Sequence, residues 1–244
     1  MIILAVGMPR AGSGWHYNLI KELMATVGYE DARDIRERFK LQGILTAVNT
    51  NIGVLSFRRL LMASLPGILG KKFVIKAHSG PTIWIKFLIE IGLFKVLYIY
   101  RDPRDAMLSA MDYGARVLDK QNRPNAFSHL TDIDKAADFF AEYIRDQANW
   151  QALTKVIATR YEDLLLDYDN EADAIVKFLG LDRTNPDVEQ VIEKNRPGGN
   201  VQEKQGTHFF KGQVGRFRDR FTTDDIEKLN QRFGESILKM GYPL

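Results

Sequence analysis

Residues 2–25 read IILAVGMPRAGSGWHYNLIKELMA, and this stretch decides the fold. The first five residues are apolar and rich in branched side chains, which is typical of a short strand buried on both faces. Glycines and a proline then break the run between Gly7 and Gly14, and apolar side chains recur at helical spacing from about Ser13 to Ala25. A strand, a glycine-rich turn and a helix in this order direct backbone N–H groups and the positive end of the helix at one point. We therefore expect a phosphate or sulfate group to bind there.

The turn matches the phosphate-binding loop of nucleoside-triphosphate enzymes only in part. Gly7 and Gly12 have the spacing of G-x-x-x-x-G-K-[ST], but Ser13 and Gly14 stand where that motif needs lysine followed by serine or threonine. The cation lies inside the loop instead, at Arg10. A tight turn between a strand and a helix, without a ligand, is the other interpretation of the same residues.

Composition and length describe an ordinary globular protein. The chain has 244 residues, of which 45% are hydrophobic and 27% are charged, and we expect a single domain over residues 1–244. Its formal net charge of +3 is too small to indicate nucleic acid but suits a small anionic ligand. The absence of cysteine excludes disulfides and thiol nucleophiles. No secretory leader precedes the first strand and no apolar stretch suits a membrane span, so we expect a cytoplasmic protein.

The rest of the chain alternates between predicted strands and helices. Further strands are predicted at 72–76, 95–100 and 156–159. Helices are predicted at 52–69, 82–91, after 105, and at 132–150, 170–180, 186–195 and 223–240. A loop with a short exposed helix is expected at 28–50, and a mobile polar loop at 114–131.

This alternation predicts an α/β protein with a P-loop-like three-layer fold, in which helices flank a central parallel sheet. Ligands of such sheets bind beyond the carboxyl ends of the strands. The predicted strands end at Gly7, His78, Arg101 and Tyr161. We therefore expect the motifs at these four positions to converge on one edge of the sheet.

The first loop resembles that of sulfotransferases that use 3'-phosphoadenosine 5'-phosphosulfate (PAPS). Residues 9–15 read Pro-Arg-Ala-Gly-Ser-Gly-Trp, where the cytosolic branch of that family has Pro-Lys-Ser-Gly-Thr-Thr-Trp. The resemblance implies that Arg10 and the loop amides hold the 5'-phosphosulfate, that Ser13 adds a hydroxyl, and that Trp15 lies near the adenine. Arginine keeps the charge of the family's lysine and can bind an oxyanion through two N–H groups. The cofactor-binding residues implied by this motif are Arg10, Ala11, Gly12, Ser13, Gly14 and Trp15. An ordinary core residue in the first helical turn is the other interpretation of Trp15.

A second motif resembles the family's site for the 3'-phosphate. That site has an arginine at a strand end, then proline, aspartate and a serine eight residues after the arginine; here these are Arg101, Pro103, Asp105 and Ser109. The resemblance implies that Arg101 and Ser109 bind the 3'-phosphate together. Two other interpretations stay open. Asp102 could hold magnesium as in P-loop NTPases, or the residues could form a structural Arg–Asp cluster.

A third motif, Lys76-Ala77-His78, resembles the family's Lys-Thr-His. An imidazole titrates near neutrality, so His78 could take the proton of an acceptor hydroxyl as that oxygen attacks sulfur. Lys76 could neutralise charge on the bridging oxygen, and Arg10 could stabilise charge on the sulfuryl oxygens. A structural role is the other interpretation of His78. The remaining histidines, at 16, 129 and 208, have no assigned role.

Two weaker matches lie later in the chain. Tyr161-Glu162-Asp163 resembles the family's Tyr-Glu-Asp, which implies that Tyr161 contacts the adenine side; a helix-capping acidic pair is the other interpretation. Residues 210–215 resemble Arg-Lys-Gly-x-x-Gly, a loop over the 3'-phosphate, so that Phe210, Lys211 and Gly212 are implied there, with Phe210 in place of the expected arginine. Residues 218–227 vaguely resemble the family's dimerisation segment, and we expect a monomer or a weak homodimer.

Together the motifs predict a PAPS-dependent sulfotransferase. It would move a sulfuryl group to a hydroxyl or amine of a small molecule and release adenosine 3',5'-bisphosphate (PAP), without a metal. A P-loop kinase or NTPase and a non-catalytic nucleotide-binding module are the alternatives. We expect residues 29–70, 79–92 and 112–131 to recognise the acceptor. Either an acceptor pocket or the core would account for an apolar cluster within them, which comprises Val54, Leu55, Phe57, Leu60, Leu61 and Met62.

Overall fold

A four-stranded parallel sheet lies at the centre of the computed structural model, which describes residues 1–121, 124–198 and 213–244. The strand order is β2-β1-β3-β4. The strands are β1 (Ile2–Gly7), β2 (Phe73–Ala77), β3 (Phe94–Tyr100) and β4 (Val156–Arg160). The predicted parallel sheet is thus confirmed, with strand bounds that differ from the expected ones by at most one residue at either end.

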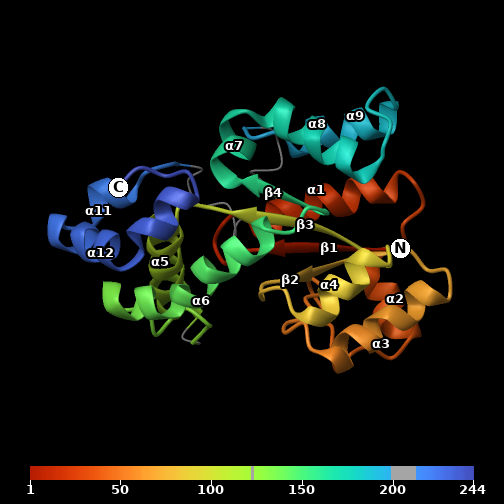
Figure 1. Ribbon diagram of the computed structural model, residues 1–244, viewed down its shortest axis with the longest axis horizontal. Coiled ribbons are helices and arrows are strands. Elements are labelled where there is room, and N and C mark those ends of the chain that lie inside the picture. The colour runs from red at the N-terminus through yellow and green to blue at the C-terminus, as the bar shows by residue number, and fades with distance from the viewer. Residues whose placement is uncertain (122–123, 199–212) are drawn as a thin grey trace.

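The register brings the carboxyl ends of the strands to one edge. Val6 of β1 pairs with Ala77 of β2 on one side and with Tyr98 of β3 on the other, while Tyr100 pairs with Arg160 of β4. All four strands run in the same direction (Figure 1). The turns that follow them therefore emerge on the same side of the sheet, as the sequence predicts.

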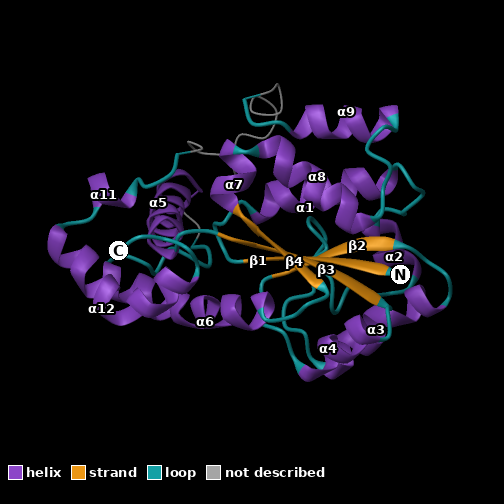
Figure 2. Ribbon diagram, turned by 45° about the horizontal axis from the view of Figure 1, so that its top comes forward, coloured by secondary structure: helices purple, strands orange, loops and turns teal. Residues whose placement is uncertain are grey.

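Helices cover both faces of this sheet, as Figures 1 and 2 show. Successive side chains of a strand point to opposite faces, so Ile2, Leu4 and Val6 of β1 belong to one core cluster and Ile3 and Ala5 to another. The second cluster packs against α1 (Ser13–Ala25), α7 (Tyr161–Leu166), α8 (Tyr168–Leu179) and α9 (Pro186–Asn195). The first packs against α2 (Ala32–Arg38), α3 (Phe57–Ile68), α4 (Ile83–Glu90), α6 (Ile133–Gln151) and α12 (Thr223–Lys239). This is the predicted three-layer arrangement.

One expectation is wrong: residues 114–121, assigned to a mobile loop, are helical. They form the last part of α5 (Pro103–Gln121), which begins directly after β3. Packing against the chain that follows accompanies the difference, because a Cβ atom at Gly114 would clash with the carbonyl oxygen of Phe127, whose ring also meets that of Tyr113 at 6.0 Å. This packing partner comes after the helix has ended, so the local polar composition does not reveal it.

The short helix α11 (Phe217–Arg220) lies shortly before α12 and leads into it. Among the helices of residues 1–121, 124–198 and 213–244, none is both long and apolar enough to cross a membrane.

Candidate active site

The loop between β1 and α1 has the geometry of an anion site. Gly12 precedes the helix with a left-handed φ of 75°, and a Cβ atom there would lie 2.6 Å from the ring of Tyr161, so only glycine fits. Arg10 also has a positive φ, 62°, which is uncommon for a residue with a side chain and marks a strained loop. Among the described residues no side chain caps the first turn of α1, which also holds no acidic residue. Its N–H groups therefore suit an anionic ligand.

Arg10 connects the first predicted motif with the second. Its Nε donates a hydrogen bond to Ser109 Oγ at 3.3 Å, and its guanidinium lies 4.4 Å from the centre of the Tyr113 ring. Burial lowers the pKa of Arg10 to about 10, so the side chain stays charged at neutral pH. Sequence reasoning missed Tyr113, although its position one helical turn after Ser109 on α5 was a usable signal.

Arg101 lies in the buried corner where β3 ends. One Nη atom lies 3.3 Å from Asp105 Oδ2 and 2.8 Å from the backbone oxygen of Gln213, and the guanidinium stacks on the ring of Tyr161 at 4.4 Å. Its Nε is buried and has no acceptor in the described part of the chain. A buried, charged donor without a partner costs free energy. The site therefore suits an anionic ligand that would accept a hydrogen bond from this Nε.

Asp105 connects the segment around Gly215 and Phe217 to the end of β3. Its side chain is fully buried and accepts hydrogen bonds from the backbone N–H groups of Gly215, at 2.7 Å, and Phe217, at 3.0 Å. The first turn of α5 thereby holds the segment that follows residues 199–212. The predicted phosphate contacts at 210–212 (Phe210, Lys211 and Gly212) lie outside the described residues.

His78 follows β2 and faces the end of β1. Its Nδ1 lies 2.6 Å from the carbonyl oxygen of Gly7. Because a carbonyl oxygen only accepts hydrogen bonds, we assign the proton to Nδ1, which leaves a lone pair on Nε2. Burial, with a smaller effect of the Lys76 charge, lowers the pKa of His78 to about 4, so the imidazole is neutral at pH 7.

Lys76 is a cation inside the sheet. Its backbone pairs with the segment 50–52, since Ile52 N–H donates to the Lys76 carbonyl at 2.8 Å, and its side chain is buried. Burial and the charge of Arg10 lower the pKa of Lys76 to about 8. Neither Lys76 nor Arg10 forms an ion pair with a carboxylate of the described residues. Two neighbouring cations without such a partner produce a positive potential that an anion would neutralise.

Trp15 belongs to an aromatic group beside the loop. Its ring stacks on that of Tyr168 with centres 6.0 Å apart and meets the edge of Tyr161 at 6.4 Å, while its Nε1 donates to Asn195 O at 2.9 Å. Tyr161 in turn lies under Gly12 and over Arg101, between the two predicted phosphate motifs. The fold therefore brings Trp15 and Tyr161 to the same edge as the charged residues.

Asp102 has a structural partner. Its carboxylate accepts two hydrogen bonds from the guanidinium of Arg104, at 3.0 Å and 2.8 Å, and both side chains are buried. The neighbouring Glu162 accepts from Tyr242 Oη at 2.7 Å and from the Asp102 N–H at 3.3 Å. A carboxylate held in this way is a poor candidate for binding magnesium, which disfavours the NTPase interpretation.

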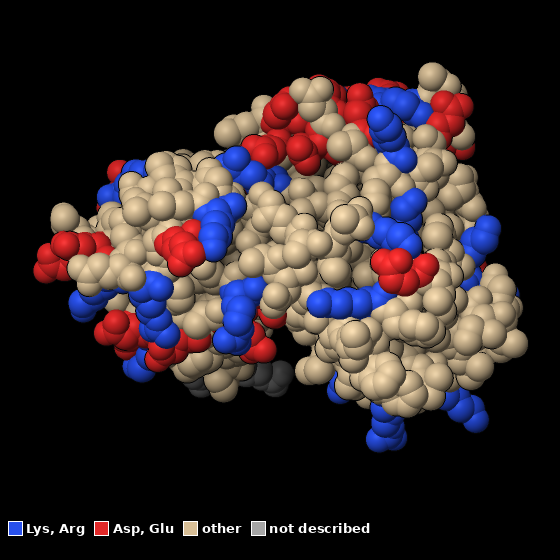
Figure 3. Space-filling view, viewed as in Figure 1, with Lys and Arg blue, Asp and Glu red and all other residues tan. Residues whose placement is uncertain are grey.

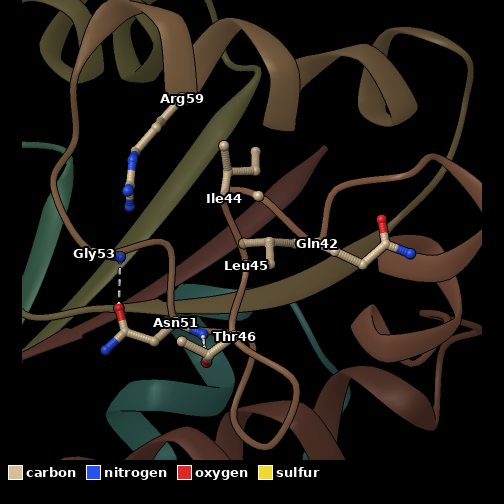
Figure 4. Close-up of a pocket in the computed structure, with 8 residues that line it drawn as sticks. Gln42, Ile44, Leu45, Thr46, Asn51, Gly53 and Arg59 are labelled. Carbon is tan, nitrogen blue, oxygen red and sulfur yellow. Dashed lines mark hydrogen bonds between the residues drawn. The ribbon is translucent and has the colours of Figure 1, made fainter.

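A separate hollow of about 260 Å³ lies between the α2–α3 connection and the start of α3 (Figure 4). Arg59 projects into it from α3, and Asn51 accepts a hydrogen bond from the Gly53 N–H at 2.7 Å. The Ser79 hydroxyl donates to the Gly53 carbonyl at 3.0 Å, which connects the wall of the hollow to the turn after His78. It is lined by Gln42, Gly43, Ile44, Leu45, Thr46, Asn51, Gly53 and Arg59.

The apolar cluster at 54–62 divides between core and surface. Leu55 and Leu60 are fully buried, and Met62 packs against the same core. Val54, Phe57 and Leu61 are more than half exposed. Leu55, Leu60 and Met62 are therefore core residues, whereas the other three side chains of the cluster face outward.

Comparisons with known proteins agree with this geometry. A family model described as "Sulfotransferase domain" matches residues 69–241. A 3-alpha-hydroxysteroid sulfotransferase of Cavia porcellus is 24% identical over 201 residues, which cover 70% of this chain and 67% of that protein. An amine sulfotransferase of Oryctolagus cuniculus is 19% identical over 260 residues, which cover 96% of this chain and 80% of that protein.

Solved structures share the fold. A mouse sulfotransferase, SULT7A1, complexed with PAP, aligns over 97% of this chain and 83% of that chain, with a TM-score of 0.67 and 18% identity. A retinol dehydratase in a complex with retinol and PAP aligns over 97% of this chain and 81% of that chain, with a TM-score of 0.63 and 17% identity. At these identities the match concerns the fold alone.

Proposed function

Because this chain belongs to the sulfotransferase family and is a sulfotransferase, we propose that it uses PAPS as the donor and His78 as the general base. The acceptor would be a small molecule with a hydroxyl or amine group. PAP in the two similar solved structures supports the choice of donor, and the steroid and amine named for the relatives support the class of acceptor. A monomer or weak homodimer, a cytoplasmic location and a single domain stay predictions from the sequence.

The described residues fit a nucleotide with two anionic ends. The open Nε of Arg101 and the hydroxyl of Ser109 would hold the 3'-phosphate, while the uncapped first turn of α1 would receive the 5' end. Arg10 lies between these two sites, since it already contacts Ser109. When bound, PAPS supplies the sulfuryl group and leaves as PAP.

His78 would act through Nε2. The Gly7 carbonyl holds the proton on Nδ1, so Nε2 is free to take the proton of the acceptor hydroxyl. A pKa near 4 makes the free imidazole a weak base. An anionic donor beside Lys76 and Arg10 would offset the nearby positive charge and raise that pKa towards neutrality, which would strengthen the base when it is needed.

Lys76 and Arg10 would stabilise negative charge. Lys76 is buried and Arg10 is half-buried, and burial lowers both pKa values, which means that their charges are poorly compensated in the free protein. Fixed cations in a partly dry site stabilise charge on a leaving phosphate without reorganisation. Positioning and fixed charge would then supply most of the rate enhancement.

The observation that carries the role of His78 is its 2.6 Å contact with the Gly7 carbonyl at the edge where the cations converge. Two measurements test the proposal. Calorimetry should show that PAP binds more tightly than ADP and without magnesium, and a panel of steroid alcohols and amines should contain an acceptor that takes labelled sulfate from PAPS. Preference for ADP with magnesium would contradict the choice of donor.

A further inference from the structure

The outer side of α3 carries an apolar stripe. Phe57, Leu61, Leu65 and Ile68 recur at intervals of four, four and three residues, so they lie on one side of the helix. Each is more than half exposed, from 51% for Leu65 to 66% for Ile68. The opposite side, with Leu60, already packs into the core. Within the described residues, the stripe therefore belongs to neither core cluster.

The outer side of α4 extends the stripe into a face. Ile83, Trp84 and Phe87 are 70%, 46% and 58% exposed. The rings of Phe57 and Trp84 lie 4.7 Å apart, which joins the two helices at their amino-terminal ends. We call the four residues of α3 and the three of α4 the α3–α4 face. A contiguous apolar surface of this kind indicates an interaction site.

The charge next to the face is mostly positive, and the acidic residue that ends α4, Glu90, is paired with Lys155 at 2.7 Å. Between Glu37 and Glu90 the sequence holds eight lysines and arginines and no acidic residue. Arg58, in the first turn of α3, and Lys72, directly before β2, are exposed, and Lys86 lies within α4. Figure 3 shows the corresponding lower right of the molecule as mostly uncharged, with Lys and Arg side chains at its lower margin. An apolar face with a basic rim complements a surface that is apolar inside and anionic outside.

We propose that the α3–α4 face binds the surface of an anionic phospholipid bilayer. The aromatic and aliphatic side chains would enter the level of the headgroups, where tryptophan is favoured, and the basic side chains would contact lipid phosphates. A second copy of the chain is a poorer occupant. A symmetric dimer would place two basic rims opposite each other, and Glu90, the acidic residue of α4, is already paired with Lys155.

The α3–α4 face lies close to His78, so membrane binding would bring an acceptor in the bilayer to the active site. This step rests on the proposed function. Ile83 lies five residues after His78. Two hydrogen bonds connect the turn between them to the segment before α3. The Ser79 hydroxyl donates to the Gly53 carbonyl, and the Thr82 hydroxyl donates to the Leu55 carbonyl at 2.8 Å. The amino-terminal ends of both helices thus lie near the catalytic edge. An amphiphilic acceptor held in the bilayer would then present its hydroxyl to the site from the headgroup level.

Vesicle sedimentation with the full chain tests the binding. We expect the protein to bind vesicles of phosphatidylcholine with phosphatidylserine, to bind phosphatidylcholine vesicles weakly, and to be released by high salt. The double substitution Leu61→Glu with Phe87→Glu should weaken binding by about tenfold or more. The control is Leu238→Glu on α12, since Leu238 is exposed by the same 56% as Leu61; binding should be unchanged. Unchanged PAP affinity verifies that the variants are folded.

Tryptophan fluorescence gives a second measurement. Trp84 is 46% exposed and Trp150 fully buried, so insertion of the face should shift the emission to the blue, and Trp84→Phe should remove most of the shift. Three results would overturn the proposal: no binding to anionic vesicles at low salt, full binding by the double variant, or a solution dimer that this variant dissociates. Turnover of a water-soluble acceptor, measured without vesicles, separates failure of the membrane proposal from failure of the proposed reaction.

Discussion

The Nδ1 atom of His78 lies 2.6 Å from the carbonyl oxygen of Gly7, so the end of β1 determines which nitrogen of this imidazole carries its proton. Gly7 ends β1 and His78 follows β2, and these two strands are neighbours in the sheet. Val6 pairs with Ala77, one residue before Gly7 and His78 respectively. Backbone pairing thereby positions the proposed base, and the hydrogen-bond partner of its Nδ1 in the described part of the chain is a backbone atom and not a side chain. A backbone carbonyl also keeps its charge state at every pH, so the tautomer does not depend on a second titrating group.

Replacing the imidazole tests this role directly. His78→Ala should lower kcat by about 100-fold or more, because it removes the proposed base that takes the acceptor proton. PAP affinity should change by less than about threefold, since the proposed phosphate contacts lie on other elements. Initial rates with labelled PAPS and calorimetry with PAP measure the two quantities. Full activity of His78→Ala would show that His78 is not the base.

The alkaline limb of the pH profile should report Lys76. A lysine loses its charge as the pH rises through its pKa, and burial with the nearby Arg10 lowers that pKa to about 8. We expect kcat/KM for PAPS to fall above about pH 8 when the acceptor does not ionise in this range. Lys76→Arg keeps its charge to much higher pH, so its profile should remain flat there. An alkaline limb at the same pH in both proteins would assign the titration to another group.

Arg101 should distinguish nucleotides with a 3'-phosphate from those without one. Loss of a charge-assisted hydrogen bond at a buried site costs about 1.5–3 kcal/mol, so Arg101→Ala should weaken PAP binding by roughly 10-fold to 150-fold. Binding of ADP, which lacks the 3'-phosphate, should change much less. Arg232→Ala on α12, at an arginine paired with Asp138, serves as the control for a lost surface charge. Equal losses for PAP and ADP would place Arg101 elsewhere in the nucleotide site.

His16 should make the fold sensitive to acid. It is fully buried, neither ring nitrogen has a partner in the described residues, and burial with the Lys76 charge lowers its pKa to about 3. The unfolded chain binds a proton at a pKa of 6.5, so unfolding takes up a proton between pH 6.5 and pH 3. The free energy of unfolding should therefore fall by up to about 1.4 kcal/mol for each pH unit below 6.5.

Denaturant unfolding at several pH values measures this slope. His16→Gln removes the titration, so the slope should become shallower even if the variant is less stable at pH 7. His78, whose pKa is lowered to about 4, contributes in the same direction and remains in both proteins. An unchanged slope in His16→Gln would mean that His16 is protonated in the folded state.

The sequence predicts those features that depend on local patterns. Apolar runs and their turns locate all four strands, and the rule for parallel sheets then brings Gly7, His78, Arg101 and Tyr161 to one edge. The order of the motifs along the chain identifies the family before any contact is known.

Contacts between distant segments could not be predicted in this way. Gly114 packs closely against the backbone of Phe127, at the start of the part of α5 that was expected to be a loop. The two N–H groups that Asp105 accepts come from residues more than a hundred positions later. The exposed stripe of α3 has the same apolar composition as a core helix, so only the three-dimensional packing shows which of its sides faces outward.

The contact between Arg10 and Ser109 leads to the last prediction. Arg10 Nε donates to Ser109 Oγ at 3.3 Å, and its planar guanidinium lies over Tyr113 at 4.4 Å. Lysine preserves the charge of Arg10 but lacks the planar group and its rigid pair of parallel N–H donors. Arg10→Lys should therefore retain activity but lower kcat/KM for PAPS by about tenfold, through poorer orientation of the phosphosulfate. Tyr113→Phe keeps the ring and should change kcat/KM little, whereas Tyr113→Leu should resemble Arg10→Lys. Wild-type kcat/KM in both Arg10→Lys and Tyr113→Leu would show that the arginine acts as a point charge, and that the stacked geometry does not contribute to the reaction.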